Sequence, residues 1–289
     1  MRATIFDGLA FAREKEKQLK QAVSELKVTP RLLSIVFRED QSSQIYTRLK
    51  MEAAVRVGIE FDRIDVSFKD DYQKIQQIIL DACKREDVHG VMIQKPAKSN
   101  WRQYANKSTI TNFSDWWTIL ASQIDPKKDA DCLTPQNLSQ IYSQQSNFMP
   151  ATVKAIFSIL RVALESQNTS LIGKNVSVIG RSDIVGRPTA EILKQKNANV
   201  SLLGSGDDLK TYTRHADIVI SATGVNNLIS GEMIKEGVIV IDVGSPRGDI
   251  DFTSVSKKVG FITPVPDGVG PVTVISLLEN LIQIIGNQA

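Results

Sequence analysis

Histidine and cysteine are scarce in the 289-residue sequence, which contains two of each. His89 and His215 have no second histidine or carboxylate at ligand spacing, and Cys83 and Cys132 lack the spacing of a zinc or redox motif. We therefore expect no metal site. The first residues carry no apolar stretch of the kind found in signal peptides, which together with the few cysteines favours a reducing, cytoplasmic location.

Long apolar runs and long basic runs are also missing. We expect no apolar segment that reaches the roughly 20 residues of a membrane span, and therefore no membrane protein. The net charge of +3 is spread along the chain, which argues against a nucleic-acid-binding protein. The chain is too long for one small domain and too short for three, so we expect two domains that share a cleft.

The first half alternates between strand-like and helix-like patterns. Residues 32–37, 61–68 and 88–94 are short and apolar, and helical patterns at 42–57 and 72–84 lie between them. Strands joined by helical crossovers predict a parallel sheet with both faces covered.

A second α/β series begins near Pro150. It contains helical patterns at 152–166 and 188–196 and strand-like segments at 176–180, 199–204, 217–224 and 238–244. This order predicts a Rossmann-type, doubly wound parallel sheet. The apolar segment 271–285 follows a Pro/Gly-rich turn at helical spacing, so we expect a C-terminal helix that returns to the first domain. The predicted domains are residues 1–147, completed by 270–289, and 148–269.

All three tryptophans, Trp101, Trp116 and Trp117, lie in one stretch without clear periodicity, close to residues 98–123. A helical excursion that packs its aromatic side chains on the scaffold is one interpretation. A lid near the substrate cleft is the other.

Two short patterns can carry chemistry. Tyr46 and Lys50 are four residues apart on a predicted helix and therefore share a face, although many solvated helices show this spacing. Short-chain dehydrogenases also use such a pair, but after the nucleotide-binding turn and not before it. The turn here runs from Gly180 to Gly186 at the start of a helix that contains Pro188, where a phosphate could bind, or it is a plain tight turn.

Seven segments in order resemble one family. They are SSQIYTRLK (42–50), GVMIQKP (90–96), IDPKKDADCLTPQN (124–137), GKNVSVIGRSDIVGRPTAEIL (173–193), ADIVISATG (216–224), IKEGVIVIDVG (234–244) and TPVPDGVGPVT (263–273). The sequence resembles the methylenetetrahydrofolate dehydrogenase/cyclohydrolase family, often called the bifunctional FolD proteins.

The resemblance implies roles for residues on the folate side. Lys50 would manage the proton in the cyclohydrolase step, Gln94 would orient it and Tyr46 would stack on the folate. Asp131 would hydrogen-bond the pterin ring. The loop residues that match the substrate site are Pro266, Asp267 and Gly270.

The resemblance also implies a dinucleotide site. The matching residues are Gly180, Arg181, Ser182, Gly186, Ser205, Thr223, Gly224, Val243, Gly244 and Thr273. Arg181 can pair with the 2′-phosphate of NADP, which is expected in preference to NAD. Asp207 and Asp208 leave NAD open, because carboxylates there repel a phosphate or hold ribose hydroxyls.

The sequence departs from the family pattern at several places. Lys95 and Lys98 stand near the expected pocket, Cys132 and Asp267 replace glycines, and residues 150–153 read Pro-Ala-Thr-Val in place of Pro-Cys-Thr-Pro. The tryptophan-rich stretch is a further departure.

The implied activity belongs to one-carbon metabolism. 5,10-Methylenetetrahydrofolate would be oxidised with NADP, and the methenyl product would be hydrolysed to 10-formyltetrahydrofolate. The alternatives are a dehydrogenase with weak cyclohydrolase activity and a non-catalytic folate- or nucleotide-binding protein. The resemblance further implies a homodimer.

Overall fold

The computed structural model describes residues 3–105, 110–145 and 148–288, in two compact units. Unit 1 comprises residues 1–13 and 141–276, and unit 2 comprises residues 14–140 and 277–289. The expected domain boundary at residue 147 and positions 106–109 of the tryptophan-rich stretch lie outside the described residues.

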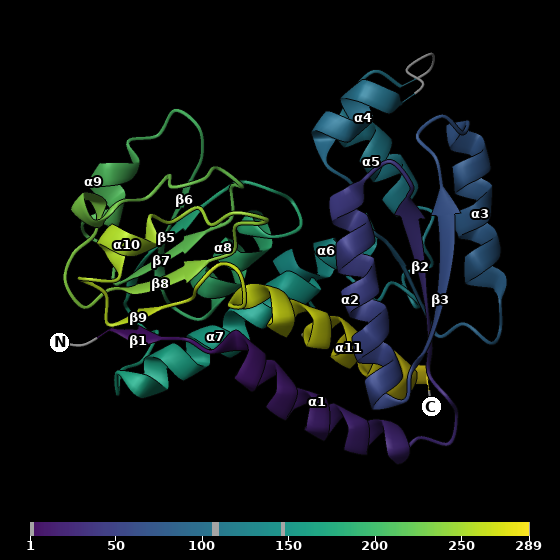
Figure 1. Cartoon of the computed structure of the whole chain (residues 1–289), viewed down its shortest axis with the longest axis horizontal. Helices are drawn as coiled ribbons and strands as arrows, with labels where there is room; N and C mark the ends of the chain where they lie inside the picture. Colours follow the sequence, from purple (N-terminus) through teal and green to yellow (C-terminus); the bar gives the residue numbers. More distant parts are fainter. Residues whose placement is uncertain (1–2, 106–109, 146–147, 289) are drawn as a thin grey trace. The chain divides into compact units, whose positions relative to one another are not determined.

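Unit 2 is built on a three-stranded parallel sheet of order β3-β2-β4. The strands are β2 (Arg31–Phe37), β3 (Glu60–Val66) and β4 (Gly90–Ile93). Helices α2 (Gln41–Val57) and α3 (Tyr72–Lys84) are the crossovers and cover opposite faces of this sheet (Figure 1). Strands β2 and β4 are buried along almost their whole length, as expected for a sheet covered on both faces.

Asp40 determines where α2 begins. Its carboxylate accepts hydrogen bonds from the Ser43 amide at 3.3 Å and the Ser42 hydroxyl at 2.6 Å, as an N-cap residue does. It also accepts one from the Ala97 amide at 2.6 Å, beyond the end of β4. Burial raises the pKa of Asp40, but these hydrogen bonds outweigh it and the net pKa is lowered. One carboxylate thus ties α2 to the segment after β4.

The tryptophan-rich stretch forms α4 (Lys98–Tyr104) and α5 (Phe113–Ala121). Trp101, Trp116 and Trp117 are all at most 5% exposed. The Trp116 ring lies 5.2 Å from that of Phe37 on β2, and Phe37 stacks on Phe68 at 4.5 Å. This geometry favours the interpretation in which the segment packs its aromatic side chains on the scaffold.

Unit 1 contains a six-stranded sheet in which every pair is parallel. Its order is β1-β9-β8-β7-β5-β6. The strands are β1 (Thr4–Ile5), β5 (Asn175–Ile179), β6 (Asn199–Leu203), β7 (Ile218–Ser221), β8 (Ile239–Asp242) and β9 (Phe261–Ile262). Strands β1 and β9 were not anticipated from the sequence, because each has only two residues and depends on pairing across most of the chain.

Alternation along these strands sends side chains into two apolar clusters on opposite faces. Val178, Ile220 and Ile241 join one cluster, which includes residues of α7 (Ala151–Ser166) and α8 (Gly186–Gln195). Val219 and Val240 join the other, on the side of the smaller elements α9 (Leu209–Thr213), η1 (Gly231–Met233) and α10 (Phe252–Val255). The sheet is therefore doubly wound, and the carboxyl ends of its strands are free to present loops.

Three further helices complete the fold: α1 (Gly8–Ser24), α6 (Pro135–Tyr142) and α11 (Val269–Gln288). Both α1 and α11 begin in unit 1 and end in unit 2. The expected α/β class, with a Rossmann-type second sheet and a returning C-terminal helix, is confirmed.

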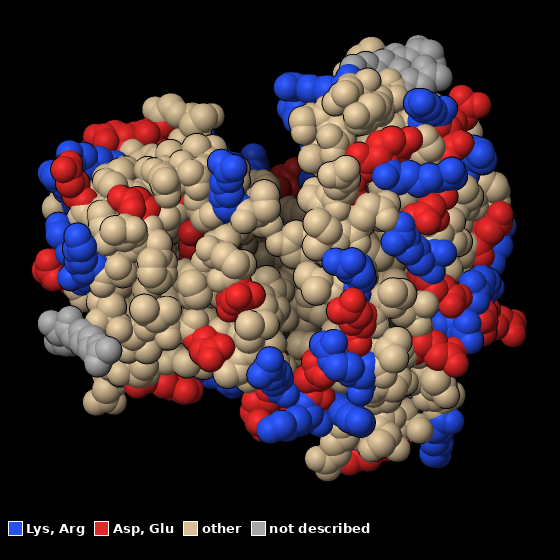
Figure 2. All heavy atoms as spheres, in the orientation of Figure 1, with Lys and Arg blue, Asp and Glu red and all other residues tan. Residues whose placement is uncertain are grey.

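Helix α11 corrects one expectation. Its residues 269–287 have a mean hydropathy of 1.5 and are long and apolar enough for a membrane span, although no such segment was expected from the sequence. Of the window tested, 61% is buried within the protein, as in the core helix of a globular fold. Acidic and basic side chains intermingle on the face drawn in Figure 2.

Candidate functional site

Lys50 and Gln94 form the centre of a polar cluster in unit 2. Lys50 is only 6% exposed on α2, and its Nζ donates a hydrogen bond of 2.7 Å to Oε1 of Gln94, the residue that follows β4. Nζ also lies 3.8 Å from the thioether sulfur of Met92. The hydrogen bonds of this buried ammonium to a neutral oxygen and a sulfur compensate its charge only weakly. Met92 was not anticipated from the sequence, where it looks like any core residue of a strand.

The electrostatics of the cluster follow from this burial. Loss of hydration lowers the pKa of Lys50, and the negative charge of Asp131 opposes that effect without reversing it. A lysine with a lowered pKa can give up and take back a proton closer to neutral pH than a surface lysine can. The cluster is therefore suited to proton transfer.

Asp131 reaches this cluster because its loop runs beside β4. The Val91 amide donates to the Lys128 carbonyl at 2.6 Å, and the Ala130 amide donates to the Val91 carbonyl at 3.2 Å. The buried Asn280 of α11 donates to the Ala130 carbonyl at 3.1 Å. The backbone next to Asp131 is thus fixed on two sides, and its half-buried carboxylate has a defined place.

Asp129 has a structural role in the loop, unlike Asp131. It is fully buried and accepts hydrogen bonds from the Leu133 and Thr134 amides at 2.9 and 2.8 Å and from the Asn137 side chain at 3.0 Å. These bonds shape the loop. Cys132 has φ 54°, a left-handed conformation that glycine adopts readily, which explains why the family pattern has glycine there.

Tyr46 lies one turn before Lys50 on α2 and is half-buried. Tyr46, Lys50, Gln94 and Asp131 all belong to unit 2, whereas the residues expected at the dinucleotide belong to unit 1. A flat ring and a carboxylate with two acceptor oxygens are the groups needed to hold an aminopyrimidinone.

The turn between β5 and α8 requires both of its glycines. Gly180 has φ 114°, and a Cβ there would lie 2.4 Å from the Ala222 carbonyl oxygen. A Cβ at Gly186 would lie 1.7 Å from the Gly180 carbonyl oxygen. The Gly186 amide donates to the Ser182 hydroxyl at 3.3 Å at the start of α8. The Arg187 amide donates to the Ser182 carbonyl at 3.0 Å, so this turn holds the amino end of α8, the kind of position at which phosphate groups bind, close to the end of β5.

Arg181 is already paired in this structure. Its Nη2 lies 2.6 Å from Oδ2 of Asp207, and the Gly204 amide donates to the same oxygen at 2.7 Å. The Arg181 side chain is 48% exposed, so solvent screens the ion pair. Ser205 is exposed in the same turn, after β6. The sequence identified both charged residues but not their contact.

The ends of β7 and β8 are tied together by two buried aspartates that the sequence analysis missed. Asp249 accepts hydrogen bonds from the hydroxyl and amide of Thr223, and Asp242 accepts one from the Gly244 amide. Gly224 is exposed and Val243 is half-buried. An acidic residue inside the apolar run of β8 is the sequence signal that could have revealed Asp242.

The loop before α11 and the first turn of α11 contain the other expected substrate residues. Pro266 and Asp267 are exposed, and Pro266 follows a cis peptide bond. Asp267 has φ 71°, so this position, like Cys132, has the left-handed backbone that favours the family's glycine. Gly270 has open space where a Cβ would be, and the Thr273 hydroxyl donates to the Val269 carbonyl at 3.1 Å.

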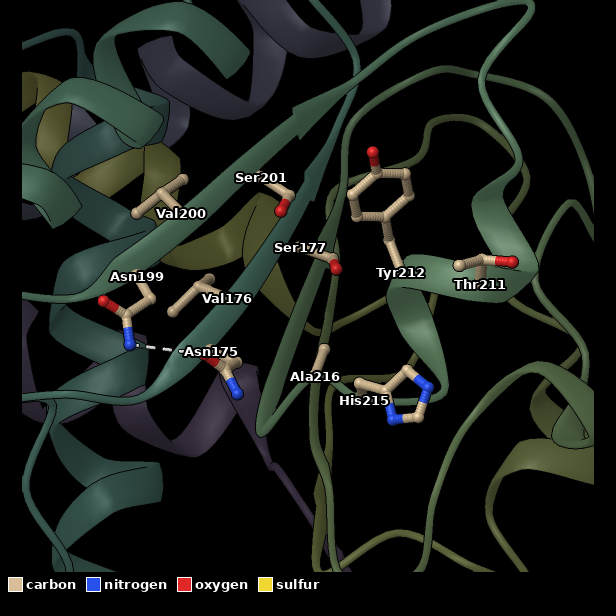
Figure 3. Close-up of a pocket in the computed structure, with 10 residues that line it drawn as sticks. All are labelled: Asn175, Val176, Ser177, Asn199, Val200, Ser201, Thr211, Tyr212, His215 and Ala216. Atoms are coloured by element: carbon tan, nitrogen blue, oxygen red, sulfur yellow. Dashed lines mark hydrogen bonds between the residues drawn. The ribbon is translucent and has the colours of Figure 1, made fainter.

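A cavity of about 380 Å³ lies elsewhere in unit 1 (Figure 3). It lies at the amino ends of β5 and β6, where Asn199 donates to Asn175 at 3.3 Å, and Tyr212 and His215 line it from the other side. It contains none of the residues expected from the sequence. Parallel sheets bind ligands at the carboxyl ends of their strands, so this cavity is not the candidate dinucleotide site.

Comparison with known proteins agrees with this geometry. The model of the tetrahydrofolate dehydrogenase/cyclohydrolase catalytic domain matches residues 6–116, and that of the NAD(P)-binding domain of the same name matches residues 150–289. The bifunctional protein FolD of Bacillus licheniformis is 36% identical over 98% of this chain and 97% of its own length.

Solved structures agree as well. The FolD methylenetetrahydrofolate dehydrogenase/cyclohydrolase of Campylobacter jejuni is 32% identical, with a TM-score of 0.87 over 99% of this chain and all of its own. The dehydrogenase-cyclohydrolase FolD of Trypanosoma brucei, solved with NADP and an inhibitor, is 32% identical, with a TM-score of 0.88 over 100% of this chain and 99% of its own. The chain therefore belongs to the tetrahydrofolate dehydrogenase/cyclohydrolase family.

Proposed function

We propose that this enzyme oxidises 5,10-methylenetetrahydrofolate with NADP and then hydrolyses the methenyl product to 10-formyltetrahydrofolate. The observation that carries this proposal is the buried Lys50–Gln94 pair in a chain that also has the β5–α8 glycine turn. The first suits proton transfer, and the second suits a dinucleotide phosphate.

The oxidation requires little acid–base catalysis by side chains. The nitrogen lone pair of the folate imidazolidine ring would drive hydride from the methylene carbon, and NADP, when bound, would supply the acceptor. The chain contributes orientation. Gly180, Gly186 and Ser182 would hold the phosphates, while Thr223, Gly224, Val243, Gly244 and Thr273 would border the nicotinamide half.

The hydrolysis needs a group that handles protons. Water attacks the methenyl carbon and loses one proton, and the ring C–N bond then breaks as that nitrogen gains a proton. The remaining hydroxyl proton leaves as the formyl C=O forms, so one proton is released overall. Lys50 would accept the first proton and return it, since burial lowers its pKa. Gln94 would hold the amine in position through its 2.7 Å hydrogen bond.

Folate recognition would depend on Asp131 and Tyr46. The Asp131 carboxylate can accept two N–H donors from the pterin edge side by side, and the Tyr46 ring can stack on a flat ring. Pro266, Asp267 and Gly270 would line the remainder of the substrate.

Preference for NADP would come from Arg181 and Ser205 acting on the 2′-phosphate. Guanidinium and hydroxyl groups are the donors that such a phosphate needs. The Arg181–Asp207 contact means that a phosphate competes with a carboxylate for the same guanidinium. NADP affinity is then set by the balance between the two anions.

We further propose that residues 1–147 with 270–289 form the folate domain, that residues 148–269 form the dinucleotide domain, and that the protein is a cytoplasmic homodimer. Strand β6 lies at the edge of its sheet, and an open edge can pair with a second copy. Sedimentation at micromolar concentration tests this: a monomer would refute the dimer.

The decisive test of function is an assay of the two half-reactions with purified protein. Formation of reduced cofactor without accumulation of the methenyl compound supports both activities. Accumulation of the methenyl compound would favour the second candidate, a dehydrogenase with weak hydrolysis, for which Lys95 and Lys98, shortly after Gln94 in the sequence, are the motivating change. Binding without turnover of either substrate would refute both.

A further inference from the structure

Asp249 is a buried acceptor at the carboxyl edge of the unit 1 sheet. It is 0% exposed, and its Oδ2 accepts three hydrogen bonds: from the Ser221 hydroxyl at 2.7 Å, the Thr223 amide at 2.7 Å and the Thr223 hydroxyl at 2.9 Å. Ser221 is the last residue of β7, and Thr223 lies two residues beyond it. A buried carboxylate with three donors on one oxygen fixes those donors firmly.

The loop that contains Asp249 is itself fixed to β8. The carboxylate of Asp242, 3% exposed, accepts hydrogen bonds from the amides of Gly244 at 2.9 Å, Asp249 at 3.0 Å and Ile250 at 3.1 Å. The Asp242 amide donates to the Thr263 hydroxyl at 2.7 Å. The chain of contacts therefore runs from β8 through the loop to the end of β7.

Asp249 also occupies the space beside Gly244. A Cβ at position 244 would lie 2.6 Å from Asp249 Oδ1 and 2.7 Å from its amide nitrogen. Oδ1 is buried and has no hydrogen-bond partner among the described residues. The same aspartate thus excludes any side chain at 244 and immobilises Thr223.

We propose that Asp249 is a positioning residue for the dinucleotide and acts through Thr223. This role rests on the proposed function. The buried carboxylate of Asp249 would hold in place the strand ends against which the nicotinamide half would lie. The Thr223 hydroxyl has one proton, which it donates to Asp249, and its oxygen accepts a hydrogen bond from the Val225 amide at 3.1 Å. The hydroxyl oxygen of Thr223 can still accept one more hydrogen bond, so a ligand group that binds it must be an N–H or O–H donor.

The test measures NADP binding directly by titration calorimetry, next to methenyl hydrolysis assayed without any dinucleotide. Asp249→Ala removes the common acceptor of three hydrogen-bond donors, so we expect the dissociation constant for NADP to rise about tenfold or more. Hydrolysis in the same preparation should remain within about twofold of the unaltered protein, because it needs no nicotinamide.

Two further variants separate positioning from general damage. Asp249→Asn keeps an acceptor oxygen and should recover most of the lost NADP affinity. Asp251→Ala removes a nearby aspartate that caps α10 by accepting from the Ser254 amide, and NADP affinity should not change. The proposal is overturned if Asp249→Ala binds NADP normally, if hydrolysis falls in parallel with binding, or if Asp249→Asn behaves like Asp249→Ala.

The outcomes also distinguish this inference from the proposed function. If the unaltered protein turns over no folate, the proposed function fails, whereas the calorimetric comparison still decides the role of Asp249. If both folate reactions proceed and the NADP affinities of all variants agree, only the inference fails.

Discussion

The ammonium group of Lys50 donates a 2.7 Å hydrogen bond to the side-chain oxygen of Gln94, and both groups come from elements tied together by Asp40. The amide oxygen stabilises the charged amine without adding a charge of its own. The pKa of Lys50 therefore stays lowered by burial, which an ion pair at position 94 would prevent.

Gln94→Glu should change the pH dependence of hydrolysis. If the neutral amine accepts the proton, the rate rises with pH as Lys50 loses its own proton. A carboxylate beside Lys50 favours the ammonium form and raises its pKa, so the rising limb should move to higher pH. Gln94→Asn, which adds no charge, is the control and should not move the rising limb to higher pH. A Gln94→Glu profile that overlays the original would argue against Lys50 as the titrating group.

Asp131→Ala should raise the folate Michaelis constant on the order of tenfold or more, because it removes a charge-assisted hydrogen-bonding pair. The NADP constant should not change, as Asp131 belongs to the other unit. Asp125→Ala is a matched control in the same segment, where the Asp125 carboxylate accepts a hydrogen bond from the Lys127 amide at 2.9 Å. Equal folate constants for the two variants would remove Asp131 from the substrate site.

Asp207→Asn should strengthen NADP binding. Releasing Arg181 from an exposed ion pair worth up to about 1 kcal/mol corresponds to a decrease of about two- to fivefold in the NADP Michaelis constant. Asp208→Asn removes the same charge from a residue that caps α9 and should have a smaller effect. A higher NAD constant in Asp207→Asn, with no gain for NADP, would show instead that Asp207 binds ribose hydroxyls.

Phe37→Ala should lower the free energy of unfolding by about 3–5 kcal/mol, as for other large-to-small changes in a core. Phe37 is fully buried and contacts both Phe68 and Trp116. Ile45→Ala, at a side chain that is 52% exposed, is the control and should have little effect on stability. Urea unfolding followed by tryptophan fluorescence measures both. A small change at Phe37 would favour a mobile lid over a packed aromatic cluster.

How far the sequence predicts the structure depends on the range of the contacts. The strands that contain Val178 and Val240 could be predicted from local apolar runs, and Lys50 and Gln94 could be named because their motifs resemble a family. The pairing of Thr4 with Phe261 could not be predicted from the sequence, since a two-residue strand has no periodicity.

The site shows the same limit. Arg181 and Asp207 were both noticed as charges, but their contact depends on how the loops after β5 and β6 approach each other. Asp249 was missed because nothing in its local pattern shows that it is buried beneath Thr223. Cys132 and Asp267 looked like departures, although their positive φ values fit the glycines they replace.

The most direct test of two separable activities in one chain is to follow reduced cofactor and methenyl compound together in Lys50→Met. Methionine fills the buried space without a proton to exchange, so oxidation should continue while the methenyl compound accumulates. Equal loss of both activities in a folded variant, or hydrolysis at the original rate, would contradict the account.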